Sequence, residues 1–368
     1  MFPLPAKNSL SERELLDFCS AIPTLGYVRT INNPKNRFVE TEVEWDPGAA
    51  PLATLRVHEE QAKSILSENN SPDLPFRYSI NPYRGCQHGC AYCYARPSHQ
   101  YWGFGAGTDF EREIIVKVNA VDVLRETFER GSYQPDLINF SGNTDCYQPL
   151  EGRYRLTRSL LAVCCEYRNP VTIITKSALV LRDLDILQEL NQQTRLRVFL
   201  SIPFANDAMG RAVEPAAAPI SRRLDALAQL SAAGIETGVA VAPLIPGLSD
   251  SAIAPVLRAS KDAGARYAFG LLLRLPQEVA PVFLSRLRQA FPLAADKVEH
   301  ALREMRGGQL HTPAFGERMR GHGPRFDALQ AIFESEAKRL GLLTRNLEEN
   351  SVSTTFRRPT SQLSLFEP

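Results

Sequence analysis

Short β-rich runs alternate with amphipathic segments from Pro75 onward, and this alternation restricts the fold more than any other feature of the chain. The alternation is typical of repeated βα units built around a parallel sheet. Strands are expected over residues 76–81, 137–141, 171–175, 196–202, 236–242 and 267–273. Helices are expected between and after them, over residues 121–130, 154–167, 179–191, 221–233, 250–263 and 278–290.

Six βα units predict an α/β fold, specifically a partial (β/α)6 barrel. Gly131, Gly234 and Gly264 stand where expected helices should end, which supports the boundaries. An apolar run inside residues 110–119 predicts an inserted strand or arm. In barrels of this kind the chemistry lies at the carboxyl ends of the strands. Reactive side chains are therefore expected in those loops.

The chain divides into four expected regions. Residues 1–75, with a short helix over 12–22, form an N-terminal extension, and residues 76–295 form the barrel. Residues 296–343 form a helical extension with a helix over 325–340. Residues 344–368 are polar and are expected to form a disordered tail.

Composition excludes several classes of protein. Forty-two basic against 41 acidic residues give a net charge of +1, which argues against a protein that coats DNA. No run reaches the ~18–20 apolar residues of a membrane span, and the first residues lack the layout of a secretion signal. Seven unevenly placed cysteines do not form a disulfide framework. We expect a cytoplasmic protein that does not contact the membrane.

Three cysteines lie within eight residues, at Cys86, Cys90 and Cys93, directly after the first expected strand. Thiolates hold iron–sulfur clusters, and three of them leave one iron of a [4Fe–4S] cluster open to another ligand. A zinc site is the alternative, with His88 or His99 as the fourth ligand. The position at a strand end of a barrel favours a reactive metal centre.

The C-x3-C-x2-C spacing, its position and the expected barrel resemble the radical S-adenosylmethionine (SAM) superfamily. Within it, the runs Asn-Pro-Tyr-Arg-Gly at 81–85 and Cys-Ala-Tyr-Cys-Tyr-Ala at 90–95 resemble the spore photoproduct lyase branch. The resemblance extends over residues 76–343. It implies a [4Fe–4S] cluster whose open iron binds SAM, and reductive cleavage of SAM to a 5′-deoxyadenosyl radical that abstracts a substrate hydrogen. It also implies an electron donor such as flavodoxin or ferredoxin.

The resemblance also implies a SAM cradle at four successive strand ends. Asn143 or Asp145 after the second strand would accept from the methionine ammonium group, and Lys176 after the third would reach its carboxylate. Ser201 ends the fourth strand and would contact the ribose. Pro243 belongs to a turn after the fifth that would contact the adenine.

Substrate-side chemistry is assigned on the same resemblance. Tyr92 and Tyr94 flank Cys93, and tyrosines assist a cysteine hydrogen donor in spore photoproduct lyases. Cys146 is a candidate donor because its S–H bond is weak, although the residue that aligns with the lyase cysteine is Gly142. A small structural loop residue is the alternative role for Cys146.

The last residues contain Gln-Leu-Ser-Leu-Phe, which resembles the peptide that docks bacterial repair proteins on the sliding clamp. Its anchors would be Gln362, Leu363, Leu365 and Phe366. The motifs together are compatible with three alternative functions. The first is a radical SAM enzyme acting on DNA, in lesion repair or modification. The second is radical SAM chemistry on RNA, a peptide or a metabolite. The third is a non-catalytic, metal-binding clamp adaptor.

Overall fold

The computed structural model describes residues 33–38, 53–344 and 354–359. Its main sheet has seven strands in the order β10-β9-β8-β7-β6-β3-β2. The strands from β3 to β10 run parallel, and β2 pairs antiparallel with β3 at one edge. These strands are β2 (Leu66–Glu68), β3 (Tyr78–Ile80), β6 (Ile138–Phe140), β7 (Val171–Thr175), β8 (Leu196–Ser201), β9 (Glu236–Leu244) and β10 (Tyr267–Leu272).

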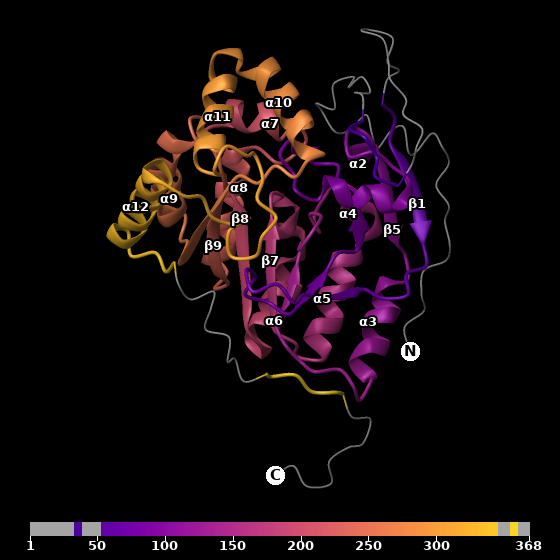
Figure 1. Ribbon diagram of the computed structural model, residues 1–368. Coiled ribbons are helices and arrows are strands. Elements are labelled where there is room, and N and C mark those ends of the chain that lie inside the picture. Colours follow the sequence, from indigo (N-terminus) through magenta and orange to yellow (C-terminus); the bar gives the residue numbers. More distant parts are fainter. Residues whose placement is uncertain (1–32, 39–52, 345–353, 360–368) are drawn as a thin grey trace, which may run out of the picture.

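All six expected parallel strands are therefore confirmed, and helices separate them along the chain as expected (Figure 1). Each helix buries one apolar face, and together the helices cover one face of the sheet. The helices are α3 (Ala120–Glu129), α5 (Leu156–Glu166), α6 (Leu184–Gln193), α8 (Ile220–Ala232), α9 (Ile253–Asp262) and α10 (Val279–Ala290). Shorter helical segments are η1 (Arg96–Trp102), α2 (Asp109–Arg112), α4 (Glu151–Tyr154), η2 (Ala178–Asp183), α7 (Asp207–Val213) and η3 (Asp250–Ala252).

A second, three-stranded sheet has the order β1-β5-β4. Its strands are β1 (Arg56–Glu60), β4 (Tyr83–Arg84) and β5 (Glu113–Lys117). Strand β5 is the inserted strand that the apolar run predicted. Strands β1 and β2 come from the expected N-terminal extension and pair with β5 and β3, so residues 53–75 are integral to both sheets. The expected helix over residues 12–22 lies outside the described residues.

Two helices follow the barrel, α11 (Pro292–Glu304) and α12 (Pro324–Arg339). Helix α12 is the expected C-terminal helix, whereas α11 was not predicted. Beyond α12, the backbone amide of Leu343 donates to Arg266 and its carbonyl accepts from Ala268, which attaches this segment to β10. No helix within the described residues is long and apolar enough to cross a membrane.

Residues 354–359 fall inside the tail that was expected to be disordered, and for them that expectation is wrong. The ring of Phe356 lies 5.3 to 5.9 Å, centroid to centroid, from the rings of Phe128, Tyr133 and Tyr167. The guanidinium of Arg358 donates to two backbone carbonyls at the end of α3, at 2.7 and 2.9 Å. These contacts lie near the amino end of β7 (Figure 1). They hold the segment against the face opposite the strands' carboxyl ends.

Replacing Phe356 by Ala should lower the free energy of unfolding by about 2 kcal/mol, because three aromatic neighbours lose their contact with the ring. Urea titration followed by circular dichroism measures the loss. A chain ending at Pro359 is the matched control and should unfold at the wild-type urea concentration. Equal stability of F356A and wild type would show that this segment is not anchored by its aromatic ring.

Candidate functional site

A cavity of about 650 Å³ lies at the carboxyl ends of the parallel strands. The loop after β3 contributes all three residues of the cysteine motif, Cys86, Cys90 and Cys93, to its wall. The ends of β6 to β9 contribute the expected cradle residues, and β10 contributes the segment that ends at Arg274. The cradle residues that line the cavity are Asn143, Asp145, Lys176, Ser201 and Pro243.

The three cysteines fit an iron–sulfur cluster better than a single ion. All three line the same cavity. No set of three or more His, Cys, Asp or Glu side chains among the described residues is close enough to hold one metal ion. A cubane spreads its thiolates over three irons, whereas zinc draws its ligands to one point.

Arg96 organises the loop that carries the cysteines. Its side chain is fully buried and forms an ion pair with Glu111, which Arg286 also contacts at 3.3 Å. Its N–H groups donate, at 2.7 to 3.2 Å, to four backbone carbonyls: Gly89, Cys90, Ala106 and Gly107. One guanidinium therefore ties the cluster loop to the segment before α2. The sequence alone did not indicate this residue.

The carboxylate of Asp145 contacts several other groups of the protein. Its carboxylate accepts from the Lys176 backbone amide at 2.8 Å and from the Thr175 hydroxyl at 2.7 Å, and it contacts His88 at 3.3 Å. Burial alone would raise the pKa of Asp145, but the His88 charge lowers it to about 2. Burial alone would lower the pKa of His88, but Asp145 raises it to about 10. Asp145 thus positions the loop after β7.

Lys176, Ser201 and Asn143 carry polar groups at neighbouring strand ends. The Lys176 ammonium donates to the Ser201 hydroxyl at 2.9 Å, and that hydroxyl donates to the Ala242 carbonyl at 3.1 Å. The Asn143 amide nitrogen donates to Ser98 at 3.2 Å, which leaves its carbonyl oxygen as an acceptor. A cation, a hydroxyl and an amide oxygen therefore face one cavity. This set can bind an amino acid carboxylate, a ribose hydroxyl and an ammonium group.

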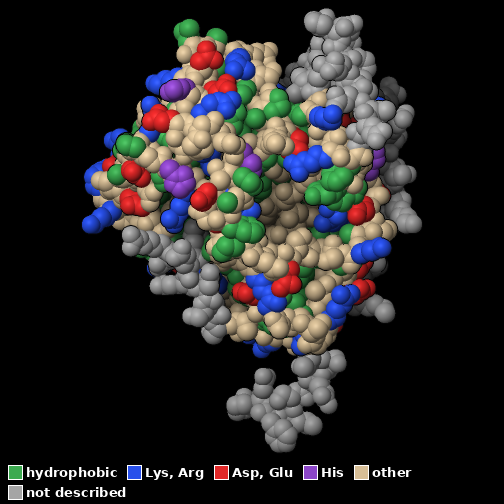
Figure 2. All heavy atoms as spheres, in the orientation of Figure 1, with side chains coloured by type: hydrophobic (Ala, Val, Ile, Leu, Met, Phe, Trp, Pro, Cys, Tyr) green, Lys and Arg blue, Asp and Glu red, His purple; other side chains and the backbone are tan. Residues whose placement is uncertain are grey.

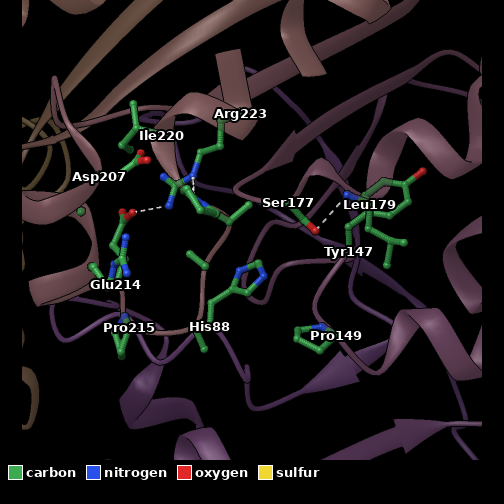
Figure 3. A pocket seen from close by; sticks show the side chains of 16 residues that line it. His88, Tyr147, Pro149, Ser177, Leu179, Asp207, Glu214, Pro215, Ile220 and Arg223 are labelled. Atoms are coloured by element: carbon green, nitrogen blue, oxygen red, sulfur yellow. Dashed lines mark hydrogen bonds and ion pairs between the residues drawn. The ribbon is translucent and has the colours of Figure 1, made fainter. Parts of the chain in front are cut away.

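The two tyrosines of the motif have different environments. Tyr92 is buried, and its hydroxyl donates to Glu214, which also forms an ion pair with the buried Arg223 at 2.5 Å. This pair lines a second cavity of about 470 Å³ beside His88 (Figure 3). Burial, followed by the negative charge of Glu214, raises the pKa of Tyr92 well above its usual value. Tyr92 is therefore fixed by its burial and by its hydrogen bond to Glu214.

Tyr94 is 46% exposed and lines the main cavity, where its hydroxyl donates to the Gly142 carbonyl at 2.6 Å. Burial of the hydroxyl end and the charge of Cys93 raise the pKa of Tyr94 to about 12, so the phenol stays protonated. A β-carbon at Gly142 would approach the Ser79 β-carbon to 2.8 Å. A cysteine side chain at this position would therefore require Ser79 to move.

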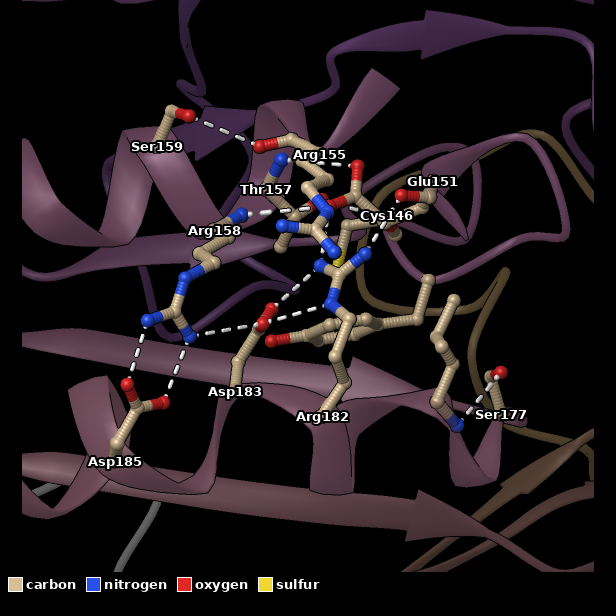
Figure 4. Close-up of polar contacts among 12 residues, drawn as sticks. Cys146, Glu151, Arg155, Thr157, Arg158, Ser159, Ser177, Arg182, Asp183 and Asp185 are labelled. Carbon is tan, nitrogen blue, oxygen red and sulfur yellow. Dashed lines mark hydrogen bonds and ion pairs between the residues drawn. The ribbon is translucent and has the colours of Figure 1, made fainter. Parts of the chain in front are cut away.

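Cys146 does not reach the main cavity, which corrects its expected position beside the substrate. It is fully buried, and its carbonyl accepts from Thr157 at 2.6 Å. It lies beside the network in which Arg182 binds Glu151 and Asp183, each at 2.7 Å (Figure 4). Burial raises the pKa of the Cys146 thiol. The alternative role, a small buried loop residue, agrees with this position.

Phe315, Arg318 and Arg274 form a further wall of the cavity, and of these three residues the sequence pointed only to Arg318. Phe315 is 61% exposed, and the Arg318 guanidinium lies 4.6 Å from its ring centroid. In the sequence, Arg318 lies in a stretch rich in Arg, His and Gly, a pattern typical of a solvated loop. Basic and acidic side chains are interspersed on the face shown in Figure 2 and do not merge into one basic band.

The profile of the radical SAM superfamily matches residues 80–259, which include the cysteine loop and the strand ends up to β9. The fold matches spore photoproduct lyase complexed with dinucleoside spore photoproduct, with a TM-score of 0.56, 17% identity, and coverage of 78% of this chain and 81% of that chain. A variant of that lyase with bound AdoMet and the same lesion matches with a TM-score of 0.55 at 18% identity, covering 79% of this chain and 81% of that one.

The chain belongs to the radical SAM superfamily, whose enzymes use a [4Fe–4S] cluster and SAM. It is 36% identical to an uncharacterized protein of Mycobacterium tuberculosis, over 72% of this chain and 78% of that protein. It is also 25% identical to the Radical SAM Nalpha-GlyT isomerase of Pseudomonas phage M6, over 57% of this chain and 42% of that protein.

Proposed function

We propose that this radical SAM enzyme abstracts a hydrogen atom from a nucleotide of DNA, in lesion repair or base modification. One observation carries the proposal. The cysteines, the polar strand ends and a wall of exposed aromatic and half-buried basic side chains all border a single cavity. The fold shared with the lyases that hold a dinucleoside lesion supports a nucleic-acid substrate by analogy.

Cys86, Cys90 and Cys93 would hold the cluster, and the strand ends would hold SAM. When bound, the two groups supply a one-electron cleavage of the SAM C5′–S bond. Lys176 would pair with the methionine carboxylate, and the Asn143 carbonyl oxygen would accept from the ammonium group. Ser201 would contact the ribose, and Pro243 would lie against the adenine. Asp145 acts indirectly, because it holds the backbone amide of Lys176.

Tyr94 is the hydrogen-bonding side chain of the motif that can contact substrate. Its ring is exposed in the cavity, whereas Tyr92, which also lines the cavity, is buried and donates to Glu214, and Cys146 lies outside the cavity. Because Gly142 stands where the lyases have their cysteine, the cavity has no matching thiol at that position. The hydrogen atom returned to the substrate radical would therefore come from Tyr94, which would become a tyrosyl radical, or from the deoxyadenosine methyl group, which would become the 5′-deoxyadenosyl radical again.

Isotope transfer tests the proposed substrate. Reconstituted enzyme would be incubated anaerobically with SAM, a reductant and oligonucleotides carrying deuterated thymine or deuterated 5-substituted thymine. The proposal predicts deuterium in 5′-deoxyadenosine, measured by mass spectrometry. Transfer from deuterated RNA or peptides, with none from any DNA, would replace it with the second function.

We further propose a cytoplasmic enzyme that receives electrons from a flavodoxin or ferredoxin and docks on the sliding clamp. The clamp anchors, Gln362, Leu363, Leu365 and Phe366, lie outside the described residues. The proposal is supported by the resemblance of their sequence and by the nearly neutral chain, which needs another route to DNA. A clamp contact would raise the local concentration of DNA around the enzyme.

Replacing Leu365 and Phe366 together by Ala should abolish clamp binding and leave SAM cleavage unchanged. We expect a roughly micromolar wild-type Kd, which corresponds to about 8 kcal/mol; the two apolar anchors supply a few kcal/mol of it, and the other anchors and the peptide backbone supply the rest. Calorimetric titration of purified clamp into each protein measures it. The matched control is S364A, which alters the same peptide without removing an anchor. Equal binding by wild type and double variant would contradict the clamp contact.

A further inference from the structure

Four basic side chains gather where the chain leaves β10. Arg274 and Arg318 line the main cavity, and Arg306 lies behind them with its Nη2 group donating to the Leu273 carbonyl at 2.9 Å. The positive charges of Arg274, Arg306 and Arg318 all act on His311, so the four side chains form one electrostatic cluster. Arg306 is only 4% exposed.

Two of these cations have no counter-charge. Arg318 forms an ion pair with Asp73 at 2.6 Å, and Glu278, the carboxylate that acts on His311, forms an ion pair with Arg37. Neither Arg274 nor Arg306 forms an ion pair with any described residue. Arg274 instead contacts the Met319 sulfur at 3.4 Å and lies 5.3 Å from the Tyr94 ring centroid.

Several buried donors of this cluster also have no hydrogen-bond partner among the described residues. They are Nε of Arg274, Nε and Nη1 of Arg306, and Nδ1 of His311. Buried donors are normally satisfied, and an unpaired buried cation is especially unfavourable. Burial, together with the charge of Arg274, lowers the pKa of Arg306 to about 10, as expected where positive charge is uncompensated. A bound anion would relieve both costs.

We propose that Arg274, at the wall of the main cavity, with Arg306 and His311 behind it, forms an anion subsite that takes a phosphodiester of the substrate. This inference rests on the proposed function and adds to it the side chains that would bind the substrate phosphate. Guanidinium groups bind phosphate oxygens in pairs of parallel hydrogen bonds. The exposed rings of Tyr94 and Phe315 line the same cavity and present faces on which a base can stack. A phosphate beside a stacking face matches a nucleotide and not an isolated carboxylate.

A thermal-shift titration tests the subsite without a nucleotide. Inorganic phosphate should raise the Tm of the full chain, and acetate at equal ionic strength should not. R274M and R306M should lose the phosphate effect while folding normally in its absence, because each substitution removes an unpaired buried cation. R258M, which alters an exposed arginine on α9, is the matched control and should respond like wild type.

The second measurement uses thymidylyl-thymidine and its neutral methylphosphonate analogue with the SAM-loaded enzyme. Wild type should bind the charged dinucleotide about tenfold or more tightly, and R274M should bind both equally weakly. Equal affinity of wild type for both, with no phosphate shift, would overturn the anion subsite. A phosphate shift without binding of either dinucleoside would keep the subsite and refute the proposed nucleotide substrate. An acetate shift equal to that of phosphate would assign the subsite to carboxylates and overturn the phosphodiester.

Discussion

Replacing any one of Cys86, Cys90 or Cys93 by Ala should remove the cluster and reduce SAM cleavage to background. All three line one cavity, and no other cysteine among the described residues does, so none of these can take the place of a missing ligand. Iron and sulfide content, the visible charge-transfer absorbance and 5′-deoxyadenosine formation measure the result after anaerobic reconstitution.

The matched control for these variants is C146A. Cys146 is buried outside the cavity, so its removal should leave iron content and SAM cleavage intact. Loss of iron in C146A would make Cys146 a ligand and refute its assignment as a buried loop residue. A single variant among the three motif cysteines that keeps full iron and activity would contradict the cluster assignment.

Replacing Arg96 by Met should lower the free energy of unfolding by about 3–5 kcal/mol and impair cluster assembly. The substitution leaves Glu111 buried with only Arg286 as a partner at 3.3 Å, and breaking a buried ion pair has a cost of this size. It also removes the donors that hold the carbonyls of Gly89 and Cys90. Chemical unfolding of the apoprotein and iron content after reconstitution measure the two effects separately.

The comparison variant is R339M, which removes an exposed arginine that pairs with Glu336 on the surface of α12. Its stability and iron content should equal those of wild type, because solvent-exposed ion pairs contribute little. If R96M matched R339M in both measurements, the buried guanidinium would not organise the cluster loop.

The barrel could be predicted from the sequence because its strands and helices have local periodicities. Val171–Thr175 and its neighbours are apolar runs of strand length, and the intervening segments repeat with helical spacing. The cysteine motif was equally local, since its three thiols lie within one loop. Helix α11 follows directly on α10 and was missed although Pro292 stands at its first position, which is a signal of a helix start.

Other parts of the site depend on contacts between distant segments, which a single sequence does not display. In the sequence, Arg96 and Glu111 are indistinguishable from ordinary surface charges. Only the fold shows that both are buried. The unpaired state of Arg306 depends on which carboxylates the fold brings near it. Cys146 follows Asp145 directly, yet the backbone turns the two side chains to different places, one in the cavity and one in the core.

The docked C-terminal segment illustrates the same limit. Composition after Leu343 predicted disorder, and a single phenylalanine in a polar stretch gives no sign of its binding place. The three aromatic rings that receive Phe356 come from α3, the loop after it and the end of α5, more than a hundred residues earlier in the chain. Tertiary packing decides the order of such a segment, and local sequence does not.

Reductive cleavage of SAM by the reconstituted protein tests the central claim most directly. The purified chain would be reconstituted anaerobically with iron and sulfide, reduced, and supplied with SAM, and 5′-deoxyadenosine would be quantified by chromatography. Electron paramagnetic resonance of the reduced protein would be recorded before and after SAM addition. We predict 5′-deoxyadenosine formation and a SAM-dependent change in the cluster signal. A protein that binds a full cluster but neither changes its signal nor cleaves SAM, or one that binds only zinc, would contradict the account.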